Sequence, residues 1–394
     1  MKKIISLALA LLIFLLAGCG PEGTVSDHRQ TTGVTNATGP SDPSHIYEEV
    51  SDKITIDAVL EYPEPDWVPA VYEASHPVLN RETVDRFLAA VGDSVAEVTT
   101  DEYLDELCTW KFFANTEKNG LVGLNYRVGS QDVTNYTFNY SVTGISKWYN
   151  HVLCYYNKYD RAEYPDYSNA EKFMEPKDFA FATAEEAEAQ VRALLELLGI
   201  HNPILTETLY LDHETLAVEE KSEVANAKMT GKGGEPEYKP EWTEADDAYH
   251  FYYLVGHEGI PVVHGLDSGR SYRYFRTDIR VIYNRDGVVY LQISNPWAFG
   301  QQVETAESIL TPQEAVEEAR EILSLTQVPH RRVVKEVSLR YYYKQEGEKV
   351  YLRPCWFVAV LGLQVQDMFQ GQDLNEPYDR YEYIVLDAIT GQEY

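Results

Sequence analysis

TAEEAEAQVRALLELLG, residues 183–199, and TPQEAVEEAREILSL, residues 311–325, are the two stretches that best indicate how this chain folds. Each opens with a threonine that is followed three residues later by a glutamate, the pattern of a capping box at a helix N-terminus. Apolar residues then recur every three or four positions, which is typical of an amphipathic helix. Because the two stretches align without gaps, they suggest a repeated unit.

Both predicted helices are followed by segments that predict antiparallel strands. After the first helix these are residues 204–211, 249–255, 260–263, 273–283 and 288–293, and after the second they are 333–343, 350–361 and 381–386. A helix laid on a sheet buries the apolar face of each. We therefore expect the α+β class, with antiparallel meander sheets each covered by one helix.

The region before the first helix is also predicted to be rich in strands. Apolar and polar residues alternate over 54–60 and 133–142, Asn119-Gly120 is a hairpin-turn signal, and residues 148–156 suggest a further strand. Asn80 can cap a short helix that ends near Val91. The predicted organisation is a signal peptide (1–19), a flexible tether (20–45), an N-terminal β-rich α+β domain (46–178) and two helix-plus-sheet modules (179–300 and 301–394).

The N-terminus has the layout of a bacterial lipoprotein signal. Lys2 and Lys3 precede a short apolar run over residues 4–17, and Leu16-Ala17-Gly18-Cys19 matches a lipoprotein cleavage site. The run is shorter than the ~20 residues that a membrane-spanning helix needs. We expect lipid on Cys19, which would anchor the chain at the outer face of the cytoplasmic membrane in the bacterial cell envelope. The alternative is an ordinary secretory signal in which the cysteine occurs by chance.

Charge and composition narrow the classes of partner. The chain of 394 residues has a formal net charge of −30, which repels nucleic acid and anionic lipid headgroups. The simplest interpretation of this acidity is solubility, and the alternative is attraction of a basic partner or of divalent cations. Thirty tyrosines and an aromatic content of 12% favour strands.

Three cysteines remain besides Cys19, and an odd number does not make a complete disulfide framework. Cys108 and Cys154 fall in the same predicted domain and could form a disulfide outside the cell. Cys355 lies in an apolar segment and is expected to be a buried strand residue.

The sequence predicts no catalytic, cofactor or metal site. His250, His257 and His264 are seven residues apart, so on strands they alternate between faces and do not readily form a zinc site. His257-Glu258 does not continue into a His-Glu-x-x-His motif because position 261 is a proline. The sequence also lacks a serine-hydrolase elbow, a phosphate-binding loop and a calcium loop. We therefore expect a protein that is not an enzyme.

Three aromatic groups could form a platform on which a sugar or a peptide stacks: Tyr155-Tyr156, Tyr252-Tyr253 and Tyr341-Tyr342-Tyr343. Neighbouring residues of a strand point to opposite faces, so we expect about half of each group to face the core. A small-ligand or glycan-binding surface lipoprotein is accordingly one functional hypothesis.

Two parts of the second half of the chain resemble known domains. Gly259-Ile260-Pro261-Val262 and the later segment 281–289, VIYNRDGVV, resemble thermolysin-type propeptides. The helix start at residue 311, the segment 352–358 (LRPCWFV) and the end 386–391 (LDAITG) resemble a PepSY domain. The resemblance covers about residues 180–394 and leaves the predicted N-terminal domain unexplained.

The resemblance implies a non-catalytic role, because modules of this kind inhibit or chaperone a peptidase or bind proteins at the cell surface. The leading hypothesis is therefore a lipid-anchored protein that binds or regulates a protein partner such as a peptidase or a membrane sensor. Gly259, Ile260, Pro261 and Val262 would offer that partner an open sheet edge on which an extended segment could pair.

Overall fold

The computed structural model describes residues 44–64, 66–77, 79–100, 103–104, 109–128, 134–154, 168–201, 203–222, 225, 238–263, 277–326, 328–347, 349–365 and 378–394. Residues 42–394 form one compact unit. The predicted signal peptide and most of the predicted tether lie outside the described residues. The compact unit contains two nine-stranded sheets, here named sheet A and sheet B.

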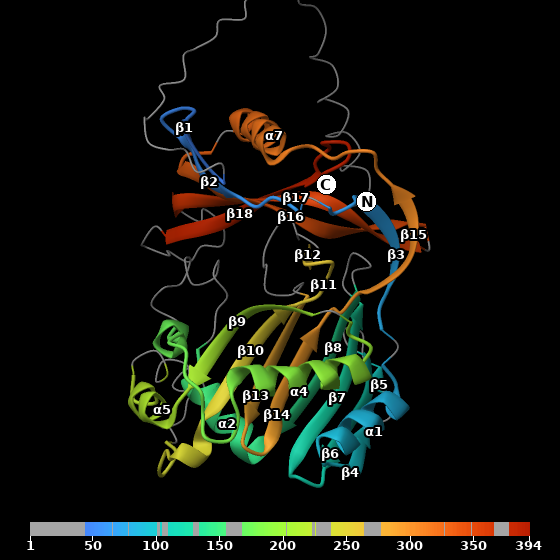
Figure 1. Ribbon diagram of the computed structural model, residues 1–394, viewed down its shortest axis with the longest axis vertical. Helices are drawn as coiled ribbons and strands as arrows, with labels where there is room; N and C mark the ends of the chain where they lie inside the picture. The colour runs from blue at the N-terminus through green and yellow to red at the C-terminus, as the bar shows by residue number, and fades with distance from the viewer. Residues whose placement is uncertain are drawn as a thin grey trace, which may run out of the picture. The chain divides into compact units, whose positions relative to one another are not determined.

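Sheet A consists of β1 (His45–Glu49), β2 (Ile54–Leu60), β3 (Ala70–Ser75), β11 (Gly256–His257), β12 (Ile260–Val263), β15 (Ala298–Thr305), β16 (Arg331–Glu346), β17 (Lys349–Val365) and β18 (Tyr378–Asp387). Its main path is β1-β2-β16-β17-β3-β15. The long strands β16 and β17 form an antiparallel hairpin, and β18 pairs with β17. β2 and β12 both pair with β16 in parallel, so this sheet is mixed. Helix α7 (Pro312–Leu325) covers one face of it (Figure 1).

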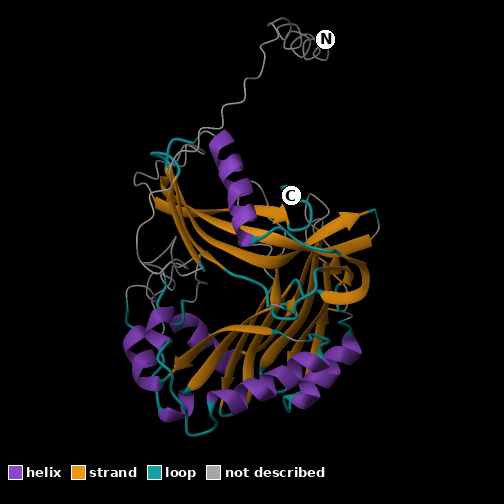
Figure 2. Cartoon of the chain, turned by 45° about the horizontal axis from the view of Figure 1, so that its top comes forward, coloured by secondary structure: helices purple, strands orange, loops and turns teal. Residues whose placement is uncertain are grey.

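Sheet B consists of β4 (Val95–Thr100), β5 (Tyr103–Leu104), β6 (Thr109–Thr116), β7 (Gly120–Val128), β8 (Thr134–Val142), β9 (Ile204–Leu211), β10 (Ala248–Leu254), β13 (Asp278–Asn284) and β14 (Gly287–Ser294). Its path is β4-β6-β7-β8-β14-β13-β10-β9, with β5 beside β6. Helices α1 (Arg81–Ala90) and α4 (Ala184–Leu197) lie along one face (Figures 1 and 2). The opposite face looks toward sheet A and is here called the inner face (Figure 2).

The three predicted helix starts are confirmed. The Thr183 side chain accepts a hydrogen bond from the Glu186 backbone N–H, and the Glu186 carboxylate accepts one from the Thr183 N–H, at 3.2 and 2.9 Å. Thr311 begins α7 with the same reciprocal capping box. Asn80 caps α1 by accepting from the N–H of Thr83 at 3.0 Å. Each cap satisfies a donor that the first helical turn leaves without a partner in the helix.

The face of sheet B under α1 and α4 forms a tightly packed apolar core. Phe87 of α1 packs edge-on against Phe138 and Tyr140 of β8, with ring centroids 5.2 and 5.3 Å apart. Along β10, the rings of Tyr249, Phe251 and Tyr253 follow one another on this same face. Full burial of a large apolar side chain is worth about 1.5–3 kcal/mol. The core therefore fixes this face against the helices and directs the alternate residues of each strand to the inner face.

The predicted fold class, two helix-covered meander modules after a separate N-terminal domain, is wrong. β1, β2 and β3 come from the predicted N-terminal domain but belong to sheet A with β15–β18. β4–β8 come from the same region but belong to sheet B, where β8 pairs with β14. Local alternation predicts which residues of a strand face the core, but it does not say which distant strand lies beside it. The sheets are consequently assembled from distant segments, and their boundaries do not follow positions 178 and 300.

One predicted strand is also wrong. Residues 148–156 were expected to be extended, but α2 (Thr143–Val152) occupies most of the described part of this segment. Its buried residues Ser146, Tyr149 and Val152 recur every third position, which is helical spacing. The Tyr149 hydroxyl donates to the backbone oxygen of Asp246 at 2.7 Å, next to the short 3₁₀ helix η3 (Glu244–Asp246). A high aromatic content favours strands on average, and here tertiary packing overrides that preference. The remaining described helices are α5 (His213–Glu219) and the 3₁₀ helix η2 (Ala170–Phe173).

Candidate functional site

A row of polar side chains crosses the inner face of sheet B. Residues that pair directly on neighbouring antiparallel strands point to the same face. Tyr252 of β10 pairs with Glu207 of β9 and with Arg280 of β13. Arg280 pairs with Gln292 of β14, which in turn pairs with Asn139 of β8. We call these five residues the polar row.

The polar row is more exposed than the opposite face of the same strands. Glu207, Arg280, Gln292 and Asn139 are partly exposed, and Tyr252 is buried. The neighbouring residues on the helix-covered face, all buried, are Phe251, Val281, Leu291 and Tyr140. The polar row is therefore the side of these strands that a ligand could contact, whereas the neighbouring residues on the helix-covered face are part of the buried core.

Arg280 and Asp278 form an ion pair beside the polar row. The Nε and Nη2 atoms of Arg280 both donate to Oδ2 of Asp278, at 3.1 and 3.0 Å. The Asp278 side chain is 4% exposed and the Arg280 side chain 27%. Burial alone would lower the pKa of Arg280, but the Asp278 carboxylate together with Tyr252 and Tyr290 outweighs it and raises that pKa above its usual range. Arg280 is thus a permanently charged donor with a fixed orientation, and its guanidinium lies 5.9 Å from the centre of the Tyr252 ring.

Tyr290 fixes the orientation of Gln292. Its hydroxyl donates to Oε1 of Gln292 at 3.0 Å. Burial raises the pKa of Tyr290, and the opposing effect of the Arg280 charge is smaller. The phenol therefore stays protonated at neutral pH and keeps donating. Because the amide oxygen is held by this bond, the NH₂ group of Gln292 is turned away from Tyr290.

His250 lies in the next row of the inner face, paired with Leu209 and Ile282. It is 3% exposed, and burial together with the nearby Arg280 charge lowers its pKa to about 3. The imidazole is consequently neutral at physiological pH. Both flanking residues are buried and apolar, which explains the large shift.

The three histidines of the sequence pattern do not meet in the described residues. His257 lies on β11 in sheet A, where its ring stacks on Phe299 with centroids 4.7 Å apart. His264 lies outside the described residues. Across the described ranges, no cluster of three or more metal-ligating side chains is found.

The sheet edge predicted at Gly259, Ile260, Pro261 and Val262 is not open. β12 pairs with β11 through His257↔Ile260 and Gly256↔Pro261, and with β16 through Val262↔Tyr341. Ile260 is 7% exposed and Val262 is 2% exposed. The prediction of a partner-binding edge here is wrong, because the chain's own strands use both sides of this segment.

The predicted tyrosine alternation is confirmed for the two groups that the structure describes, and Tyr155-Tyr156 lies outside the described residues. Tyr253 lies on the helix-covered face of sheet B, whereas Tyr252 belongs to the polar row. In sheet A, Tyr341 is fully buried and packs edge-on against Tyr72, with ring centroids 6.0 Å apart. Tyr342 lies on the other face, 4.6 Å from the ring of Tyr394.

Two of the four cysteines, Cys154 and Cys355, lie within the described residues. Cys355 is fully buried on β17, as predicted, and burial raises the pKa of its thiol. Cys154 is buried just after α2, but Cys108 lies outside the described residues, so their disulfide stays a prediction. Cys19 also lies outside them. Among the described helices, none has the length and apolar content that crossing a membrane requires.

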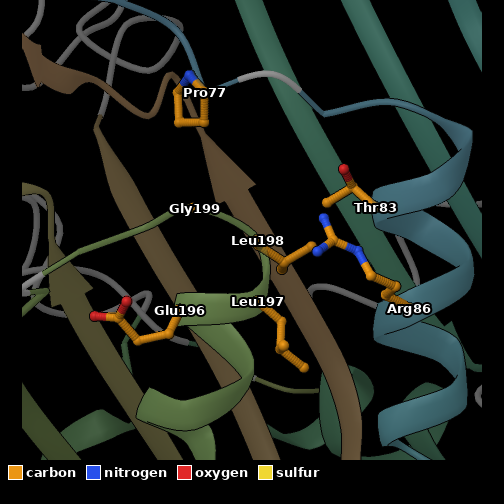
Figure 3. Close-up of a pocket in the computed structure, with 7 residues that line it drawn as sticks. All are labelled: Pro77, Thr83, Arg86, Glu196, Leu197, Leu198 and Gly199. Atoms are coloured by element: carbon orange, nitrogen blue, oxygen red, sulfur yellow. The ribbon is translucent and has the colours of Figure 1, made fainter.

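A depression in the surface lies between α1 and the C-terminal end of α4. It has a volume of about 380 Å³ and is lined by Pro77, Thr83, Arg86, Glu196, Leu197, Leu198 and Gly199. In Figure 3 the guanidinium of Arg86 points toward Leu198, whereas the carboxylate of Glu196 points away from Arg86. Leu197 is 38% exposed at this place. The polar groups that line this depression do not converge on one point.

Comparison with known proteins gives a fold but no activity. No protein-family model matches the chain, and no curated protein matches it either. Four chains of solved structure are similar. One of them, the 1.45 Å crystal structure of an uncharacterized protein from Eubacterium rectale ATCC 33656, has a TM-score of 0.56 and 17% identity, and the match covers 89% of this chain and 93% of that one. At this identity the likeness shows a shared fold alone.

Proposed function

We propose that this chain is a non-catalytic binding protein of the bacterial cell envelope, anchored by lipid on Cys19, that binds a glycan on the polar row of sheet B. The observation that supports it is the partly exposed row of guanidinium, amide and carboxylate groups across five strands. Such groups on rigid strands, next to aromatic rings, suit a ligand with many hydroxyl groups.

A glycan is better supported than a protein partner. The edge that was expected to serve a protein partner, at Ile260–Val263, is paired with β11 and β16. The inner face of sheet B, in contrast, presents polar side chains beside the Tyr252 ring that can hydrogen-bond the hydroxyl groups of a glycan.

The expected affinity for one glycan segment is modest. A hydrogen bond contributes about 0.5–1.5 kcal/mol net, so four of them total about 2–6 kcal/mol, which corresponds to a dissociation constant between roughly 0.04 and 30 mM. Many lipid-anchored copies facing a polymer would bind it far more tightly, because each further contact becomes effectively intramolecular. Anchoring and weak single-site binding therefore suit one another.

The experiment is a screen of the whole chain, purified in detergent micelles, against immobilised oligosaccharides, followed by calorimetric titration of the strongest ligand. Gln292→Ala and Asn139→Ala should each weaken binding about fivefold, because each removes one or two hydrogen bonds. Gln302→Ala is the matched control, since Gln302 is an exposed strand amide on β15 of sheet A. Binding that is unaffected by both inner-face variants, or absent from the whole screen, refutes the proposal.

A further inference from the structure

We infer that the depression between α1 and α4 binds a short apolar peptide whose two ends are both free. Both helices lie along the face of sheet B that is opposite the inner face, so this site is separate from the polar row (Figures 1 and 2). The inference therefore goes beyond the proposed function and does not depend on it. It follows from the apolar floor of the depression and from two opposite charges at its sides.

The floor of the depression is apolar. Pro77 and Leu198 are both buried, and Leu197 beside them is 38% exposed. The volume of about 380 Å³ lies within the ~300–1,000 Å³ that is typical of ligand sites. An apolar side chain placed here would remove the exposed surface of Leu197 from water, which is favourable. The floor thus suits a ligand with apolar side chains.

Arg86 supplies a positive charge on the α1 side. The neighbouring Arg81 is paired with Asp85 at 2.8 Å, whereas Arg86 forms no ion pair with any residue that the structure describes. Its guanidinium points toward Leu198 and thus toward the apolar floor (Figure 3). A guanidinium can donate two parallel hydrogen bonds to one carboxylate. Arg86 is therefore available to bind the carboxylate end of a ligand.

The C-terminal end of α4 supplies a negative charge on the other side. Glu196 lies in the last turn of this helix, which contains no basic residue, and the C-terminus of a helix carries a partial negative charge. One carboxylate oxygen of Glu196 is bonded to Nδ1 of His201 at 2.6 Å, and the other has no hydrogen bond to a described residue. The carboxylate points away from Arg86, so the two charges do not neutralise one another (Figure 3). This side is therefore available to bind an ammonium group.

Two opposite charges on either side of an apolar floor match a zwitterionic peptide. Its carboxylate would bind Arg86, its ammonium group would bind Glu196, and its side chains would cover Leu197. A free amino acid carries both charges on one carbon atom, whereas the ends of an extended dipeptide lie roughly 7 Å apart. Such a ligand has no net charge, so the field of a chain with a net charge of −30 does not repel it. A short peptide therefore suits this site better than a single amino acid or an anion.

The test is a ligand-observed NMR titration of the whole chain in detergent micelles with leucyl-leucine, its N-acetylated form and its C-amidated form. A salt concentration of about 0.15 M screens charges that are more than ~8 Å away. The wild type should bind leucyl-leucine and should bind each blocked form about fivefold more weakly, the upper value for one exposed ion pair.

Two variants and one control assign the two ends of the peptide. Arg86→Gln should weaken leucyl-leucine binding about fivefold and bind the amidated form as the wild type does, because that form lacks the same ion pair. Glu196→Gln should behave in the same way toward the acetylated form. Arg285→Gln removes an exposed arginine from the turn between β13 and β14 and should leave all three affinities unchanged. The three positions are exposed, so the urea midpoints should stay close to that of the wild type.

Three results would overturn the inference, and none of them bears on glycan binding. Blocked forms that bind as tightly as leucyl-leucine remove the requirement for free ends. A variant at Arg86 or Glu196 that binds leucyl-leucine like the wild type removes the ion pair assigned to that residue. Absence of leucyl-leucine binding removes the peptide site altogether, while oligosaccharide binding to the polar row is measured separately.

Discussion

Stability near the polar row should depend on pH through one buried histidine. His250 is 3% exposed and its pKa is lowered to about 3, against an ordinary value of 6.5. Below about pH 6.5 the unfolded chain therefore takes up a proton at His250 that the folded chain does not. The contribution of His250 to the free energy of unfolding is consequently full above that pH and is lost progressively as the pH falls toward 3. The slope is about 1.4 kcal/mol per pH unit, so the loss between about pH 7.5 and about pH 5 amounts to about 2 kcal/mol.

Urea unfolding at these two pH values, followed by tryptophan fluorescence, measures this loss in the wild type and in His250→Gln. The glutamine has no proton to gain, so the variant should lose about 2 kcal/mol less than the wild type between the two conditions. Burial also lowers the pKa of His76, but that residue is present in both proteins and its effect cancels in the comparison. Equal losses in the two proteins would refute the assignment of a buried, neutral His250.

Three further predictions follow from other parts of the chain. Cys19→Ser should abolish incorporation of a labelled fatty acid and release the protein from membranes, and label retained in the variant would contradict the predicted lipoprotein signal. Thr311→Ala should lower the free energy of unfolding by about 1 kcal/mol because it removes the cap of α7, and Thr311→Ser should restore most of it in the same denaturation assay. Asp278→Asn should lower the free energy of unfolding by about 2 kcal/mol. This is less than the full penalty for breaking a buried ion pair, because the Arg280 side chain is 27% exposed. An unchanged urea midpoint would show that the ion pair is not formed.

Local sequence patterns predict most of the individual elements well. β9 (Ile204–Leu211) has the predicted bounds, and both capping boxes form. What the patterns do not predict is the partner of each strand. The pairing of Ser141 with Tyr290 joins segments that are distant in the chain, and their alternation is equally compatible with other neighbours. The error in fold class arises from this step.

The candidate site could be predicted only in part. The alternation rule correctly separates Tyr252 from Tyr253. A usable signal for the ion pair exists in the sequence, because Asp278 and Arg280 are two residues apart on one strand and therefore share a face. The pairing of Arg280 with Gln292 depends on the register between β13 and β14, which shifts between Ile282 and Tyr283 in a way that the sequence pattern does not reveal.

The central claim is that the inner face of sheet B is where this protein holds its glycan ligand. A crystal structure of the protein with the strongest oligosaccharide from the screen tests this most directly. We predict a sugar whose hydroxyl groups lie within hydrogen-bond distance of the Gln292 and Asn139 amides. A sugar bound elsewhere, for instance in the depression between α1 and α4, would contradict the account.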